Sequence, residues 1–230
     1  MNVLHSVERI QQRATNLKVY DQVRDALVAG RFRPGDTLST RQFAEALGVS
    51  QMPVREAFHR LVAEGVLENR PNRTIGLPTI TLPEFEEIVE MRIHLESFAA
   101  FKAAPIIAEQ DVSALCSLAD DMERAAGARD TTSHLGLNRQ FHFILYRASG
   151  STELVKLIEQ IWLRIGPFLN WISSPTDTRA RSNRNHRAII AACRDRDADG
   201  AAKAVTKDLT DGAEVVRARL RALTGPGPTA

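Results

Sequence analysis

Residues 30–73 read GRFRPGDTLSTRQFAEALGVSQMPVREAFHRLVAEGVLENRPNR and decide the fold of the first part of the chain. Apolar residues recur at helical spacing in two short segments, one that ends at Gly48 and one that runs from Ser50 to a break at Gly65. Ser50 can cap the second helix, and Pro53 falls in its first turn, where a missing N–H is tolerated. Two helices joined by about four residues that include a glycine indicate a helix-turn-helix.

The residues around these two helices extend the motif. Upstream, the spacing predicts a helix over 16–30, preceded by an arm or a frayed helix, and Ser39 or Thr40 caps the first helix of the pair. Downstream, 66–69 and 74–77 read as two short strands joined by a turn. A β-hairpin directly after the second helix makes this a winged helix-turn-helix.

The remaining sequence shows helical spacing only. A capping box over 81–84 starts it, and the expected helices cover 82–104, 108–126, 131–149, 152–173, 177–195 and 198–223. The predicted fold class is therefore mainly α. Residues 1–78 form the winged helix-turn-helix domain, and residues 79–230 form an all-α bundle of about six helices.

Composition limits the class of protein. The chain has 230 residues, of which 43% are hydrophobic and 25% charged, so it can bury a core and is not intrinsically disordered. No run approaches the ~18–20 apolar residues of a membrane span, and the N-terminus lacks the apolar core of a signal peptide. Cys116 and Cys193 stand apart without CxxC spacing, which favours buried reduced thiols over a disulfide or metal pair. These features predict a cytoplasmic protein without a membrane partner.

The net charge of +2 divides unevenly along the chain. Residues 1–80 carry 11 Lys and Arg against 8 Asp and Glu, whereas the remainder carries 19 against 20. A mildly basic first part joined to a slightly acidic second part is consistent with a nucleic-acid module attached to another domain.

The second helix of the motif has the pattern of a DNA-reading helix. Such a helix offers polar side chains near its N-terminus to the major groove and packs its apolar face against the domain. Arg55 could bond guanine in a bidentate manner, Gln51 could pair with adenine, and Arg41 could meet a phosphate or a base edge. The predicted DNA-binding residues are Arg41, Ser50, Gln51, Met52, Arg55 and, at the wing tip, Asn72 and Arg73. The alternative is a winged helix that binds protein and carries ordinary surface arginines.

Polar residues on three helices of the second part form a possible ligand set. Asn138 and His142 are four residues apart on one helix face, His186 lies in a later helix and Asp208 in the last. An amide oxygen, two imidazoles and a carboxylate could bind Zn²⁺, Ni²⁺ or Mn²⁺ with positions open for a ligand oxygen. The spacing alone equally allows ordinary core or surface residues.

Arg92 lies beside the apolar stripe of the helix over 82–104. Either it forms a surface salt bridge with Glu96, four residues on, or it turns inward and clamps a carboxylate ligand. His134, one turn before Asn138, could reach the same face, but a surface position is expected for it.

The run from Val19 to Leu77 resembles the DNA-binding domain of GntR-family bacterial transcription regulators. Two departures concern Gln51-Met52, where the family usually has Arg-Thr, and Thr74, where it usually has Gly. The segments EIVEMRIHLESFAA, NRQFHFILYRASGSTEL and NHRAIIAACRDRDADGAAKAVTKDL resemble the FCD effector domain of the FadR-like subgroup, and this likeness spans about 84–212.

The resemblance implies roles for the polar residues of the bundle. In many FCD domains an Asp and three His hold a metal that receives a carboxylate effector. The matching positions here are Asn138, His142, His186 and Asp208, so the usual Asp and the third His are both replaced. One divalent metal at these four residues, and a metal-free pocket in which they bond the effector directly, both remain open. The expected effector-binding residues are Arg92, Asn138, His142 and His186.

Together these observations predict a homodimeric transcription regulator and not an enzyme. Two winged domains would read a palindromic double-stranded DNA operator, and a small organic acid in the bundle would release them, which makes repression the expected action. One alternative is a metal-dependent enzyme built on the bundle, although no HExxH, nucleophile elbow or phosphate loop is present. Another is an architectural DNA-binding protein indifferent to sequence, against which the modest charge of residues 1–80 argues.

Overall fold

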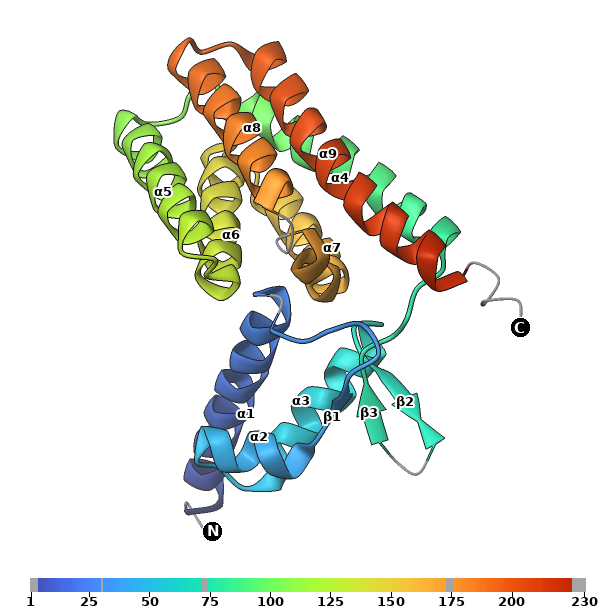
Figure 1. Ribbon diagram of the computed structural model, residues 1–230. Helices are drawn as coiled ribbons and strands as arrows, with labels where there is room; N and C mark the ends of the chain where they lie inside the picture. Colours follow the sequence, from blue (N-terminus) through green and yellow to red (C-terminus); the bar gives the residue numbers. More distant parts are fainter. Residues whose placement is uncertain (1–3, 30, 72–73, 173–175, 225–230) are drawn as a thin grey trace, which may run out of the picture.

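The computed structural model describes residues 4–29, 31–71, 74–172 and 176–224. A smaller N-terminal part with three helices and a small sheet lies against one end of a helical bundle (Figure 1). The predicted fold class, a winged helix-turn-helix followed by an all-α region, is confirmed. None of the described helices is both long enough and apolar enough to cross a lipid bilayer.

The N-terminal part consists of six elements. In chain order these are α1 (Leu4–Val28), β1 (Thr37–Leu38), α2 (Thr40–Leu47), α3 (Gln51–Ala63), β2 (Glu68–Arg70) and β3 (Thr74–Gly76). The strands form an antiparallel sheet in the order β1-β3-β2, in which Ile75 of β3 faces Leu38 on one side and Asn69 on the other. The buried faces of α1 and α3 pack against each other, and the buried residues of the sheet belong to the same hydrophobic core.

Three details differ from the sequence prediction. Helix α1 begins at Leu4, so the stretch before residue 16, predicted as either an arm or a frayed helix, continues the helix. Strand β1 was not predicted, because a two-residue strand is too short to show alternation. Strand β2 starts later than expected because the N–H groups of Val66 and Leu67 bond to the carbonyl of Leu61 and close the end of α3.

The helix caps follow the sequence signals closely. The hydroxyl of Ser39 accepts from the backbone N–H of Gln42 at 3.3 Å, so Ser39 rather than Thr40 caps α2. Gly48 ends α2 in the left-handed region, with φ of 64°, a conformation that glycine adopts without strain. Ser50 occupies the N-cap position of α3, but its side chain makes no capping hydrogen bond.

The bundle contains every helix that the sequence predicts, with each end within one residue. The helices are α4 (Leu82–Ala103), α5 (Glu109–Gly127), α6 (Thr131–Ala148), α7 (Thr152–Ile172), α8 (Thr176–Arg194) and α9 (Ala198–Thr224). The capping box forms as expected, because Glu84 accepts from the backbone N–H of Thr81 at 2.7 Å. Helices α4 and α9 lie side by side along the bundle (Figure 1). Both cysteines are free, and Cys193 is buried as predicted, but Cys116 is only half-buried.

Candidate effector cavity and DNA-reading surface

Helix α3 has one packed face and one open face. Val54, Phe58 and Leu61 are fully buried, because their spacing places them on the side that faces α1 and α2. The predicted DNA-binding residues Ser50, Gln51, Met52 and Arg55 are all exposed at or near the N-terminal end of the helix. Side chains in these positions can reach base edges when such a helix enters the major groove.

The three arginines near this surface differ in their partners. Arg41 is exposed and pairs with Glu45, with 2.9 Å between Nε and Oε1. Arg60 pairs with Glu64 and lies over a tyrosine ring of α1, so it faces away from the helix tip. Arg55 makes no hydrogen bond or ion pair with any residue that the structure describes. Of the three arginines, Arg55 therefore has the guanidinium that is most available to bind another molecule.

The wing is anchored at its base by an arginine. Arg70 of β2 donates to the carbonyl oxygens of Gly35 and Leu77, at 2.7 and 2.6 Å, and pairs with Glu68. Gly76 lies opposite it, and a Cβ there would lie 2.6 Å from the guanidinium carbon, so a larger residue would displace the end of the Arg70 side chain. The predicted wing-tip residues Asn72 and Arg73 lie outside the described residues.

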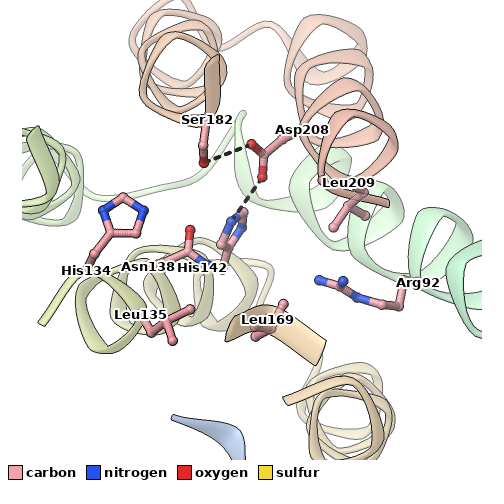
Figure 2. A pocket seen from close by; sticks show the side chains of 10 residues that line it. Arg92, His134, Leu135, Asn138, His142, Leu169, Ser182, Asp208 and Leu209 are labelled. Atoms are coloured by element: carbon pink, nitrogen blue, oxygen red, sulfur yellow. Dashed lines mark hydrogen bonds and ion pairs between the residues drawn. The ribbon is translucent and has the colours of Figure 1, made fainter. Parts of the chain in front are cut away.

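A cavity opens inside the bundle between α4, α6, α7, α8 and α9 (Figure 2). Its volume is about 50 Å³, which suits an ion with a few waters or a very small acid. It is lined by Arg92, His134, Leu135, Asn138, His142, Leu169, Ser182, Asp208, Leu209 and Gly212. Three of the four predicted effector-binding residues, Arg92, Asn138 and His142, are thus brought together here.

Asp208 forms the centre of a polar cluster. Its Oδ2 lies 3.3 Å from Nε2 of His142 and 3.8 Å from Nε2 of His186, and its Oδ1 accepts from Ser182 at 3.5 Å. Burial alone would raise the pKa of Asp208, but the neighbouring His186 and His142 lower it. Burial lowers the pKa of His186 to about 3, so this imidazole is neutral at pH 7.

These residues have the chemistry of a cation site. One ligand atom from each of His142, His186 and Asp208 lies within 4.8 Å of the other two. Neither ring nitrogen of His186 has a hydrogen-bond partner within the described part of the chain, although the ring is fully buried. A buried imidazole without a partner is costly unless another group binds it. Asn138 is half-buried on the same helix face as His142 (Figure 2). The set of two imidazoles and one carboxylate therefore fits a divalent metal.

Arg92 was expected either to pair with Glu96 at the surface or to turn inward toward a ligand, and the structure combines features of both. It pairs with Glu96, with 2.6 Å from Nε to Oε1, but this pair is buried and not on the surface. Burial alone would lower the pKa of Arg92, but the charge and hydrogen bond of Glu96, together with Tyr146 and Asp208, raise it. Its Nη1 makes no hydrogen bond to any described residue, so it can still bind an anion in the cavity.

Two residues of the site were misjudged or missed from the sequence. His134 was expected at the surface but is 3% exposed, because α5 covers it, and its Nδ1 lies 3.3 Å from the carbonyl oxygen of Met122. Tyr146 was not predicted, yet its hydroxyl donates to Glu96 at 2.5 Å and lies 3.0 Å from Nδ1 of His142. Burial, together with the charge of Glu96, raises the pKa of Tyr146 well above its ordinary value. Its position four residues after His142 was the available signal.

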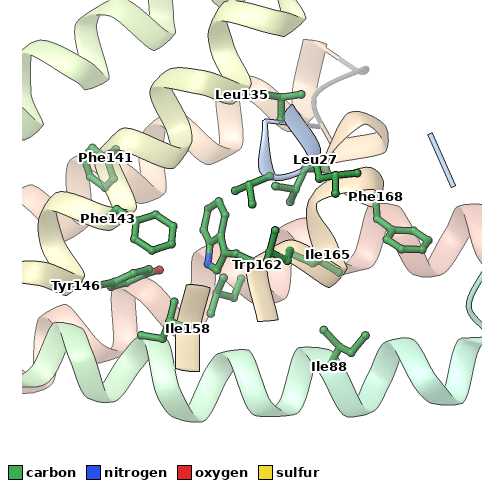
Figure 3. Close-up of a cluster of buried hydrophobic side chains, with 14 of the residues drawn as sticks. Leu27, Ile88, Leu135, Phe141, Phe143, Tyr146, Ile158, Trp162, Ile165 and Phe168 are labelled. Carbon is green, nitrogen blue, oxygen red and sulfur yellow. The ribbon is translucent and has the colours of Figure 1, made fainter. Parts of the chain in front are cut away.

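The two parts of the molecule meet at the end of α1. Figure 3 shows Leu27 of α1 among bundle side chains that include Leu135, Trp162 and Ile165. Gly166 of α7 lies directly against α1, since a Cβ there would lie 2.4 Å from the carbonyl oxygen of Leu27. Because Leu135 also lines the cavity, one apolar cluster joins the cavity to the N-terminal part.

Comparison with known protein families gives two matches. Residues 15–76 match the family described as bacterial regulatory proteins, gntR family, and residues 87–211 match the FCD domain. The second match alone covers more than half of the chain.

The individual relatives are also named as transcription regulators. The chain is 31% identical to the HTH-type transcriptional regulator McbR of Escherichia coli K12 over 80% of this chain and 84% of that protein. It is 30% identical to the Nta operon transcriptional regulator of Aminobacter aminovorans over 75% and 80%, and 25% identical to the E. coli K12 transcriptional repressor RspR over 88% and 89%. The solved structure of E. coli McbR/YncC superposes with a TM-score of 0.83 at 28% identity, over 89% of this chain and 98% of that one.

Proposed function

The chain belongs to the GntR family of bacterial regulatory proteins, and from this premise we propose that it is a repressor released from its operator by a small carboxylate. Residues 1–78 would bind DNA, and residues 79–230 would bind the effector and a second copy of the chain. Among the relatives, RspR is named a repressor, which supports this direction of control. Membership in a family of transcription regulators favours this function over an enzyme.

The exposed tip of α3 supports the DNA-binding half of the proposal. Arg55 is exposed and unpaired within the described structure, and Gln51 and Met52 stand beside it. In this proposal Arg55 reads a base edge, while Arg41, Asn72 and Arg73 bind the backbone or the minor groove.

The observation that carries the effector half is a buried arginine that faces a cavity beside a histidine–aspartate cluster. Arg92 would bind the carboxylate, and Asn138, His142 and His186 would complete the site. The present volume of about 50 Å³ admits only a very small acid, so a larger effector must move α7 or α9 as it enters.

We propose that His142, His186 and Asp208, with Asn138 beside them, hold one divalent metal. A bound Zn²⁺, Ni²⁺ or Mn²⁺ would supply a Lewis acid with open positions for carboxylate oxygens. Arg92 is the protein's own contribution to anion binding and does not depend on the metal.

The apolar joint between the parts gives a route for control. Movement of α7 would pass directly to α1, because Gly166 and Leu27 meet without an intervening side chain. Allosteric coupling between two sites is typically about 1–3 kcal/mol, which here would change operator affinity roughly 5–150-fold.

Helix α4 carries the surface that we assign to the homodimer. Met91, Phe98 and Phe101 are 40%, 52% and 42% exposed and follow one another at helical spacing. Large apolar side chains clustered at the surface mark an interaction site.

The DNA-binding half is tested with Arg55→Ala. Duplexes are first selected from a random pool by the wild-type protein, and affinity is then measured by fluorescence anisotropy at fixed salt. Loss of a bidentate base contact should weaken binding by about 1–3 kcal/mol, or roughly 5–150-fold, and relax the preference at one position. Arg184→Ala removes an exposed arginine of α8 and should change nothing. Equal affinities for Arg55→Ala and wild type would refute the role of α3, and a uniform loss across sequences would favour an architectural binder.

The dimer surface is tested with Phe98→Glu. Burying a charge in place of an aromatic ring should dissociate the dimer and lower operator affinity at least tenfold, because each half-site then binds alone. Sedimentation velocity measures the mass. Ile106→Glu places the same charge at another exposed apolar residue, 64% exposed, and should leave the dimer intact. A dimeric Phe98→Glu protein would place the interface elsewhere.

A further inference from the structure

A continuous chain of buried polar groups runs from α4 to the candidate metal cluster. Arg92 donates to Glu96, Tyr146 donates to the other oxygen of Glu96, and Nδ1 of His142 lies 3.0 Å from the Tyr146 hydroxyl. The other ring nitrogen of His142, Nε2, lies 3.3 Å from Asp208. This series of hydrogen-bonded groups therefore ends at the atoms that the proposed metal would contact.

The donors and acceptors in this chain can be assigned one by one. Glu96 is the carboxylate of an ion pair with Arg92, and a carboxylate can only accept hydrogen bonds. Tyr146 has a single hydroxyl proton, which it therefore gives to Glu96. Its oxygen can then only accept from His142, so Nδ1 of His142 must carry a proton.

This assignment determines what Nε2 can do. When a neutral imidazole carries its proton on Nδ1, Nε2 has a lone pair and no hydrogen. That lone pair faces the carboxylate of Asp208, and Nε2 of His186 lies 3.8 Å from the same carboxylate. Acceptors opposed in this way repel one another unless a cation lies among them, either a second proton on His142 or a metal ion.

We propose that Tyr146, held by Glu96, is a positioning residue that fixes the Nδ1–H tautomer of His142 and presents Nε2 as a ligand to a divalent cation. The inference rests on the metal site of the proposed function. It assigns Tyr146 a role that the hydrogen-bond partner of a metal-binding histidine commonly has, which is to set the tautomer and the ring orientation.

The direct test is the protonation of His142 in the metal-free protein. Long-range ¹⁵N–¹H NMR distinguishes a protonated ring nitrogen from an unprotonated one. In the wild type we expect Nδ1 of His142 to be protonated, whether or not Nε2 also carries a proton toward Asp208 in the absence of metal. The opposite tautomer would overturn the proposal without need of any variant.

Tyr146→Phe keeps the ring and removes the hydroxyl. In this variant the proton of His142 should move to Nε2, where it can bond to Asp208. Zn²⁺ affinity, measured by competition with a chelator, should fall about 10–100-fold, as is usual when such a partner is removed. An unchanged tautomer and unchanged Zn²⁺ affinity would overturn the role of Tyr146.

Tyr20→Phe is a matched control, because Tyr20 is the other tyrosine of the chain and its hydroxyl also donates to a glutamate, at 2.6 Å. It should alter neither the His142 tautomer nor the Zn²⁺ affinity. A wild-type protein that binds no Zn²⁺ would overturn the metal site itself, whereas the tautomer measurement decides the role of Tyr146 separately.

Discussion

The same three groups form a hydrogen-bonded trio in both parts of the molecule: an arginine, a glutamate four residues later and a tyrosine from another helix. The outer trio, in the N-terminal part, and the inner trio, in the bundle, consist of Arg60, Glu64 and Tyr20 and of Arg92, Glu96 and Tyr146. In both, the arginine Nε donates to one glutamate oxygen and the tyrosine hydroxyl donates to the other. These two bonds are common to both trios, although Nη2 of Arg92 also donates to the second oxygen of Glu96, at 3.3 Å, and Arg60 also lies over the Tyr20 ring.

Burial gives the two trios different functions. The arginine and glutamate side chains of the outer trio are 55% and 34% exposed, whereas those of the inner trio are 8% and 1% exposed. Water can replace a lost partner in the outer trio but not in the inner one. The outer trio therefore only joins α3 to α1, while the inner trio must remain complete and can determine the state of its neighbours.

The largest expected effect comes from Glu96→Ala. Removal of this carboxylate leaves the Arg92 charge buried without a partner, and the free energy of unfolding should fall by about 3–5 kcal/mol. Urea denaturation followed by circular dichroism measures the loss. A loss below 1 kcal/mol would show that water reaches the inner trio.

The pH dependence of stability above pH 10 is the next largest effect. Burial and the Glu64 charge raise the pKa of Tyr20 to about 12, and burial and Glu96 raise that of Tyr146 well above its ordinary value. Unfolded tyrosines lose their protons near pH 10. The folded state binds more protons above that pH, so both contributions are fully present below pH 10. The contribution of Tyr20 is lost as pH rises through about 12, and that of Tyr146 as pH rises through its own raised pKa.

Each tyrosine should lower the free energy of unfolding by up to about 1.4 kcal/mol per pH unit in that range. Tyr20→Phe should remove the contribution of Tyr20 to the fall in unfolding free energy with pH, and Tyr146→Phe should remove that of Tyr146. Lysines also titrate in this range, but they do so equally in the wild type and both variants. Absorbance at 295 nm reports the ionisation directly. If the Tyr146 hydroxyl ionised before that of Tyr20, the comparison between the trios would be reversed.

The smallest effect is expected for Glu64→Ala. An exposed ion pair contributes about 0–1 kcal/mol, and about 1 M salt should remove the difference from wild type, because charges are then screened beyond roughly 3 Å. Glu96→Ala should show the same loss at low and high salt. Denaturation at two salt concentrations gives both values, and equal salt dependence in the two variants would contradict the assigned burial.

Local signals predict the fold well because each acts over a few residues. The capping box at Thr81, the glycine at Gly48 and the helical spacing of the bundle each specify an element end by nearby groups alone. The prediction fails where ends depend on distant contacts. Strand β1 exists only because β3 lies beside it.

The candidate site could be predicted only in part, for a similar reason. The family resemblance picks out Arg92, His142 and Asp208, and the structure places them around one cavity. Whether His134 lies at the surface depends on α5, which covers it, and no local pattern records that packing. The bond from Tyr146 to Glu96 joins residues 50 positions apart, so only the packing of α6 against α4 reveals it.

The contact at Gly166 bears on how this protein could be re-engineered. A backbone carbonyl of α1 occupies the space where a side chain at position 166 of α7 would begin, so at this point no side chain can adapt to a new partner. Chimeras that graft another winged domain onto this bundle would need to reproduce the end of α1 as well as the linker. Such grafts should therefore join the two sequences where the end of the new helix aligns with the end of α1, and should keep Gly166 in the bundle.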